Sequence, residues 1–204
     1  MPKLKKTKNE LKAQREALQR YERFLPTLEL KKQQLQREVR RAEAGLRRCV
    51  RRRDELFAGL RPWAGLLTTS PDLASYVRVE EVEREIVNIA GVNVPVLLGV
   101  RLAAPDIDYF ATPAWLDDAV TVLGELVRLE AETAVLERQR ELLGEELRLT
   151  SQRVNLFEKV MIPQTLDNIR MIRIALGDAQ TAAVGRAKLA KSKTVTVLSG
   201  KSSA

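Results

Sequence analysis

The chain has 204 residues and a formal net charge of +8; 30% of its residues are charged, 4% are aromatic, and none is histidine. The absence of histidine excludes histidine-based nucleophile pairs and most zinc sites, and a single cysteine, Cys49, excludes an intrachain disulfide. Few aromatic and many charged residues favour long helices over a compact core.

Residues 1–61 are predicted to form one coiled-coil helix. Mostly apolar residues recur every seven positions from Leu4, and a second set lies three positions after the first. The two sets are Leu4, Leu11, Leu18, Leu25, Lys32, Val39, Leu46, Arg53 and Leu60, and Thr7, Gln14, Tyr21, Leu28, Leu35, Ala42, Cys49 and Leu56. Lys32 and Arg53 interrupt the pattern, and Cys49 is interpreted as a small core residue. Pro26 costs about 3 kcal/mol in a helix interior, which predicts a kink or a local break.

Residues 62–115 form a predicted connector of different character. Two runs rich in β-branched residues, 83–89 and 94–101, flank a short turn that contains Gly91. This pattern predicts a β-hairpin over about 83–101, with Pro95 marking the second strand as an edge strand.

A second coiled-coil helix is predicted over residues 116–190, with its start near Thr112 and Pro113. Thr112 suits the N-cap, and Pro113 suits the first helical position. The apolar stripe advances in steps of four and three and reads Val122, Leu126, Leu129, Thr133, Leu136, Arg140, Leu143, Leu147, Thr150, Val154, Phe157, Met161, Gln164, Asn168, Met171 and Ala175. Pro163 lies inside this stripe, and we expect it to bend the helix or to open one backbone hydrogen bond.

Each helix carries one narrow apolar stripe that has to be covered. The connector is long enough for the chain to return, so we predict that the two helices pair antiparallel within one chain; a parallel dimer of each helix is the competing arrangement. The predicted fold class is mainly α, a long antiparallel two-helix coiled coil with a small central β-hairpin region. Residues 191–204 are predicted to form a flexible tail.

Charge is distributed unevenly along the chain. Residues 1–61 contain 19 basic and 8 acidic residues, residues 62–150 contain 7 and 16, and residues 151–204 contain 9 and 3. Basic ends and an acidic middle suggest different partners for different parts of the chain.

A run of arginines near the end of the first helix is the strongest charge feature, comprising Arg47, Arg48, Arg51, Arg52 and Arg53. It is interpreted as pairing with the acidic stretch of the returning helix or with a protein partner. A solvated face and a nucleic-acid contact are the alternatives.

The sequence contains neither a phosphate-binding loop nor a dinucleotide-binding glycine motif. Its acidic clusters lack the spacing of a calcium loop. We therefore expect no enzyme activity, no catalytic residue, no cofactor and no metal. No apolar run approaches the roughly 18 residues of a membrane span, so neither a span nor a signal peptide is predicted.

The string Arg153-Val154-Asn155-Leu156-Phe157-Glu158-Lys159-Val160-Met161-Ile162-Pro163 closely resembles a signature of the D subunit of the V/A-type rotary ATPases, the central rotor shaft. Further matches lie along the chain at 28–35 (LELKKQQL), at 88–95 (NIAGVNVP), at Thr112-Pro113 and at Arg186-Ala187-Lys188. Their order and spacing cover nearly the whole chain.

This resemblance implies a role in a cytoplasmic complex that is peripheral to a membrane. The paired chain ends would enter a hexamer of catalytic and regulatory nucleotide-binding subunits. A small accessory central-stalk subunit would bind the shaft near the hairpin, and a socket subunit would connect it to the ion-translocating membrane ring. Neither nucleic acid nor the membrane itself would be contacted directly. The motif residues Arg153, Asn155, Glu158, Pro163, Gly91 and Pro95 become candidate partner contacts.

Two other functional classes remain open from the residues alone. One is a cytoplasmic coiled-coil adaptor unrelated to rotary motors. The other is a basic coiled coil that binds nucleic acid, which would show strongly salt-dependent retention on DNA or RNA.

Overall fold

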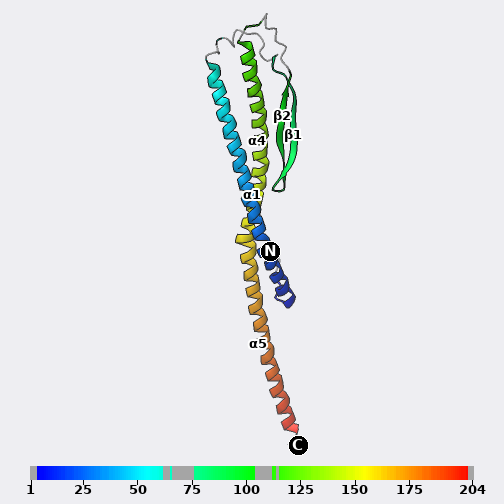
Figure 1. Cartoon of the computed structure of the whole chain (residues 1–204). Helices are drawn as coiled ribbons and strands as arrows, with labels where there is room; N and C mark the ends of the chain where they lie inside the picture. Colours follow the sequence, from blue (N-terminus) through cyan, green and yellow to red (C-terminus); the bar gives the residue numbers. More distant parts are fainter. Residues whose placement is uncertain (1–3, 62–64, 66–75, 104–111, 114, 202–204) are drawn as a thin grey trace. The chain divides into compact units, whose positions relative to one another are not determined.

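The computed structural model describes residues 4–61, 65, 76–103, 112–113 and 115–201, with side chains up to residue 191. Its elements, drawn in Figure 1, are α1 (Lys8–Leu60), β1 (Val79–Ile89), β2 (Val92–Leu102), α4 (Leu116–Leu156), the π-helical turn η2 (Phe157–Met161) and α5 (Ile162–Lys201). The predicted class, mainly α with a small central β-hairpin, is confirmed. Residues 62–64, 66–75, 104–111 and 114 of the predicted connector and residues 202–204 of the predicted tail lie outside the described residues.

The chain divides into two compact units, which we call the terminal unit (Met1–Glu29 with Gln152–Ala204) and the central unit (Leu30–Ser151). Each unit pairs part of α1 with a later helix in antiparallel fashion. In the terminal unit Tyr21 meets Phe157 and Gln14 meets Asn168. In the central unit the cross-helix ion pairs are Lys31 with Glu146 and Arg52 with Glu125. The predicted antiparallel coiled coil is therefore confirmed within each unit.

Helix α1 follows the predicted heptad pattern closely. Its fully buried side chains are Leu35, Ala42 and Cys49, all from the second heptad set. Burial raises the pKa of the Cys49 thiol above its ordinary value, and the nearby carboxylate of Glu132 acts in the same direction. The thiol therefore stays protonated at neutral pH and acts as a core residue, as predicted.

The helix has no break at Pro26, and two arginines of the predicted apolar stripes lie outside the seam. α1 continues through Pro26 without a break, because this proline is exposed and the carbonyl that loses its donor can reach water. The side chains of Arg53 and Arg140 lie on the apolar stripes in sequence but are exposed. Long arginine side chains can leave a seam in this way and keep the guanidinium in water.

The hairpin packs on the paired helices of the central unit. Leu35 from α1, Val94 from β2 and Leu143 from α4 form one buried cluster, each at most 1% exposed. The side chains packed around this cluster are Val39, Ile89, Ala90, Val92, Leu142 and Leu147. In Figure 1 both strands run beside α4. Helix α4 is therefore covered on two sides, and one narrow stripe does not describe it.

The hairpin itself is an antiparallel pair with Ile86 opposite Pro95 and Val87 opposite Val94. Leu98 forms a bulge, since Glu83 pairs with Gly99 and Arg84 with Leu97. The hairpin extends beyond the predicted 83–101 at both ends.

Helix α4 begins at Leu116, the first residue of the predicted range 116–190 and three residues after Pro113. The N–H of Leu116 donates to the carbonyl of Pro113 at 3.0 Å, and the N–H of Ala119 donates to the carbonyl of Trp115 at 3.1 Å. Pro113 therefore belongs to the turn before the helix, and Thr112 is not the N-cap.

At the other end α5 continues to Lys201, although residues 191–204 were expected to form a flexible tail. The stretch immediately before, residues 179–191, is rich in alanine, lysine and arginine, which favour helix. Extending an established helix costs far less than starting a new one, so α5 runs on into the more polar residues. No described helix is long and apolar enough to cross a membrane.

Thr150 offers a test of the central core. Its side chain is fully buried (0% exposed), and its hydroxyl makes no hydrogen bond within the described part of the chain. Because an unsatisfied buried hydroxyl is costly, Thr150→Val is expected to raise the free energy of unfolding by about 1 kcal/mol. Thr165 is the matched control, because its hydroxyl donates to the carbonyl of Met161 at 2.6 Å. In urea unfolding, Thr165→Val should leave the free energy of unfolding unchanged or lower it. An equal rise in the free energy of unfolding of both variants would contradict the role given to the Thr150 hydroxyl.

Candidate functional site

Four of the six predicted site residues lie on one helical segment of the terminal unit. Arg153 and Asn155 are in the last turn of α4, Glu158 is in η2, and Pro163 is the second residue of α5. All four are exposed. The structure thus places them on one helical segment, although Arg153 and Asn155, two residues apart, point to different sides of it. The other two, Gly91 and Pro95, belong to the hairpin of the central unit.

The turn η2 is the local consequence of Pro163. Proline has no N–H, and its ring clashes with the carbonyl four residues earlier, here that of Lys159. The helix responds by inserting one residue: the N–H of Ile162 donates to the carbonyl of Phe157, five residues back. The prediction that Pro163 would open a backbone hydrogen bond is realised as this π turn.

The inserted residue changes which side chains face α1. After η2 the buried residues are Thr165, Ile169 and Ile172, at 5%, 6% and 0% exposure. The predicted stripe used Gln164 and Met171 instead, and both are exposed. The prediction was wrong by one position here, because each residue of a helix turns the side chain by about 100° and the π turn holds one extra residue.

Two contacts fix the alignment of α1 against this segment. The rings of Tyr21 and Phe157 lie with their centroids 5.2 Å apart and their planes at 58°. Such tilted aromatic pairs add to simple burial. Further along, the side-chain amide of Asn168 donates to Gln14 at 3.5 Å, a polar contact that helps to define register.

Outside the seam, the same helix carries large apolar side chains that are about half exposed. We name this set the outer apolar surface: Leu156, Val160, Leu166, Met171 and Ile174, each 47–56% exposed. Single exposed apolar residues are normal, but a group gathered along one helix beside Pro163 marks an interaction surface. Sequence reasoning missed it, although apolar residues off the heptad stripe were its visible signal.

The charge of the terminal unit is strongly positive. Its sequence contains 17 basic and 7 acidic residues. Arg153, Arg170 and Arg173 are exposed on the same helix as the outer apolar surface. Apolar side chains interspersed with arginines suit a protein partner that offers both acidic groups and apolar contacts.

Gly91 and Pro95 have structural roles in the hairpin. Ala90 and Gly91 both adopt positive φ, 52° and 82°, as the two-residue turn requires. A side chain at Gly91 would also meet the ammonium of Lys31, 3.6 Å from an added Cβ. The carbonyl of Pro95 accepts a hydrogen bond from the Gln139 side chain at 2.6 Å, which ties β2 to α4.

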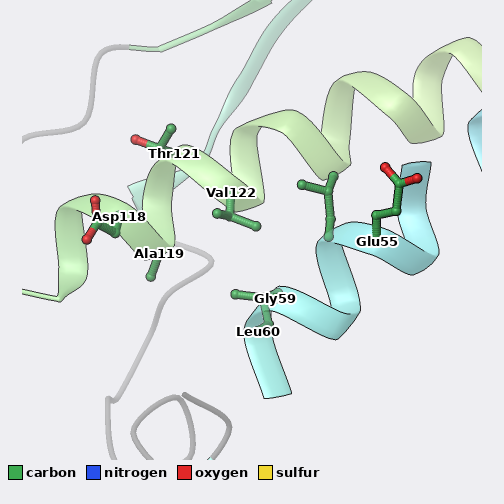
Figure 2. Close-up of a pocket in the computed structure, with 8 residues that line it drawn as sticks. Glu55, Gly59, Leu60, Asp118, Ala119, Thr121 and Val122 are labelled. Atoms are coloured by element: carbon green, nitrogen blue, oxygen red, sulfur yellow. The ribbon is translucent and has the colours of Figure 1, made fainter. Parts of the chain in front are cut away.

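A cleft of about 340 Å³ lies between the end of α1 and the start of α4. It is shown in Figure 2 and is lined by Glu55, Leu56, Gly59, Leu60, Asp118, Ala119, Thr121 and Val122. The lining is mainly apolar, and Glu55 forms an ion pair with Arg52 at 3.6 Å. Within the described ranges no three His, Cys, Asp or Glu side chains are grouped to hold a metal. A mainly apolar lining of this kind is typical of a gap between two helix ends.

Comparison with known proteins matches residues 10–192 to the family described as the D subunit of ATP synthase. Among curated proteins, the V-type ATP synthase D subunit of Borreliella burgdorferi is 40% identical, over 96% of each chain. The proteins of the same name from Chlamydia caviae and Chlamydia abortus are 36% and 38% identical, over 93% of each chain.

Proposed function

Because the chain belongs to the ATP synthase D-subunit family, we propose that it is the central rotor shaft of a V/A-type rotary ATPase. In this role it transmits torque between an ATP-hydrolysing hexamer and an ion-translocating membrane ring. The chain itself is non-catalytic, and it resides in the cytoplasm, attached to the membrane through the complex.

The outer apolar surface is the observation that carries this proposal. A shaft that turns inside a hexamer has to contact successive subunits without locking to one of them. Apolar contact is non-directional, so it tolerates sliding better than a set of fixed hydrogen bonds does. The 17 basic residues of the terminal unit add a long-range attraction to an acidic bearing surface.

The seam of the coiled coil supplies the stiffness that torque needs. On the seam side, Ile169 and Ile172 are almost fully buried, and the Tyr21–Phe157 contact resists sliding of one helix past the other. The seam residues therefore hold the shaft together, while the half-exposed side chains outside the seam remain available. The family-motif residues Arg153, Asn155, Glu158 and Pro163 belong to this same segment and are proposed to contact the hexamer.

Further partners follow from the same proposal. A small accessory central-stalk subunit and a socket subunit on the membrane ring bind the remaining surface of the chain, including the hairpin region of Gly91 and Pro95. Direct contact with nucleic acid or with lipid is not part of this role.

Charges placed on the outer apolar surface test the proposal. The double variant Val160→Asp/Ile174→Asp is expected to reduce ion transport per ATP hydrolysed roughly tenfold in the reconstituted complex, because apolar contacts to the hexamer are lost. The matched control, Gln164→Asp/Gln180→Asp, adds the same charge at exposed polar positions of α5 and should couple normally.

Circular dichroism establishes that both double variants remain helical. Equal loss of coupling in the two variants would argue against a specific role for the outer apolar surface. If the wild-type chain, expressed with its neighbouring gene products, did not co-purify with a hexameric ATPase, the proposed function itself would be wrong. An adaptor or a nucleic-acid-binding protein would give that result.

A further inference from the structure

The exposed side of α1 in the central unit carries a row of arginines that the proposed function assigns to no particular partner. We call it the arginine face: Arg37, Arg40, Arg47, Arg48 and Arg51, all exposed. Their spacing of three, four and seven places them on one side of the helix, opposite the seam residues Ala42 and Cys49. Ala44, also exposed, lies at the middle of this side. From the first to the last arginine the helix rises by about 20 Å.

The arginine face is largely unneutralised. Elsewhere in the central unit, arginines meet carboxylates: Arg52 reaches Glu125 at 3.2 Å, and Arg101 lies 3.2 Å from Glu81. Within the arginine face only Arg47 has a carboxylate of the described residues within 4.0 Å, that of Glu43. Like charges three and four residues apart weaken a helix. An ordinary solvated face would alternate in sign, so this arrangement costs stability that a partner can recover.

The choice of arginine over lysine is also informative. Residues 33–61 contain nine arginines and no lysine, whereas residues 1–32 contain seven lysines and three arginines. Lysine serves a solvated face equally well and is depleted at protein interfaces. Arginine offers a planar fork that binds a carboxylate through two hydrogen bonds.

Apolar side chains flank the arginines on the same helix. Val50 is 40% exposed and Phe57 is 53% exposed, and they are seven residues apart, so both lie on one side of α1, between the arginine face and the seam. Arginine together with an aromatic residue is the composition typical of protein interface hot spots.

We propose that the arginine face is a docking surface for a folded protein partner that presents carboxylates over about 20 Å, with an apolar contact for Val50 and Phe57. Nucleic acid fits less well, because the central unit as a whole contains 18 basic and 20 acidic residues and would repel a polyanion at long range. The inference rests on the proposed function in one respect: the partner is expected to be another subunit of the rotary ATPase complex.

Crosslinking from the middle of the arginine face tests this proposal. The photocrosslinking residue p-benzoylphenylalanine is placed at Ala44 in the tagged full chain, which is expressed with the other subunits of the complex. Irradiation of the purified complex should give one discrete adduct with a partner subunit. The matched control is the same residue at Ala134, an exposed position of α4, which should not give this adduct.

Charge reversal then tests the chemistry. With Arg37→Glu, Arg40→Glu, Arg48→Glu and Arg51→Glu combined, the Ala44 adduct and the amount of that partner in the complex should fall roughly tenfold, while the nucleotide-binding subunits remain. The four corresponding Arg→Lys changes should reduce binding less, because the charge remains and only the fork is lost.

Several outcomes overturn the inference: no adduct from Ala44, an adduct with nucleic acid, or a partner that is retained after charge reversal. Circular dichroism shows whether the charge-reversed variant is still helical, which separates loss of docking from loss of folding. If that variant is unfolded, the adduct formed from position 44 in the otherwise wild-type chain decides the question. Failure of the proposed function is distinguishable, because the nucleotide-binding subunits would then be missing from the wild-type preparation.

Discussion

Replacement of Leu143 by alanine is expected to lower the free energy of unfolding of the central unit by about 3 kcal/mol. Leu143 is 1% exposed and belongs to the buried cluster that joins α1 through Leu35 and β2 through Val94. Truncation removes buried methyl groups and leaves a cavity that three elements surround. A two-stranded hairpin is marginal by itself, so it depends on this contact.

Leu98→Ala is the matched control, because Leu98 lies on the hairpin bulge and is 62% exposed. Its effect should stay within about 0.5 kcal/mol. Urea unfolding of the full chain, followed by circular dichroism, measures both variants. Hydrogen exchange in β2 should accelerate in Leu143→Ala only. Similar losses in the two variants would mean that the cluster does not anchor the hairpin.

A chain that lacks Val160 and carries Pro163→Ala is expected to fold with a free energy of unfolding within about 1 kcal/mol of the wild type. The deletion removes the extra residue of η2, and alanine restores the N–H that an α-helix needs. Thr165, Ile169 and Ile172 then keep their places in the seam on an uninterrupted α-helix. The variant tests whether the π turn exists because of Pro163.

Deletion of Asp167 is the control for that variant. Asp167 is exposed, as is Val160, but it lies within regular α-helix between Thr165 and Ile169. Its loss turns Ile169 and Ile172 by about 100° out of the seam, which should cost about 3 kcal/mol or more. Hydrogen exchange of peptides covering 165–175 reports the effect directly. If both deletions destabilised the terminal unit equally, the one-residue explanation of the seam shift would be wrong.

Much of the candidate site was visible in the residues themselves. The motif at 153–163 and the hairpin turn with Gly91 stand in the sequence as short strings. The outer apolar surface was not recognised, because apolar residues off the heptad stripe indicate a surface only once the seam residues of α5 are known. The arginine run near residue 50 was predicted to pair with the returning helix, and among those five arginines only Arg52 forms such a pair within the described residues.

The sequence by itself determined the helical class and the hairpin, because these depend on periodicity and turn chemistry, which are local properties. The length of the connector favoured antiparallel pairing, but only the tertiary structure decided between that pairing and a parallel dimer. Tertiary structure alone decided which residues are buried after Pro163. A heptad pattern assumes a constant angle per residue, and the π turn adds one residue that no pattern records. Tertiary structure also decided that α4 is covered on two sides, since the place where the hairpin packs depends on Leu35, Val94 and Leu143, which are far apart along the chain.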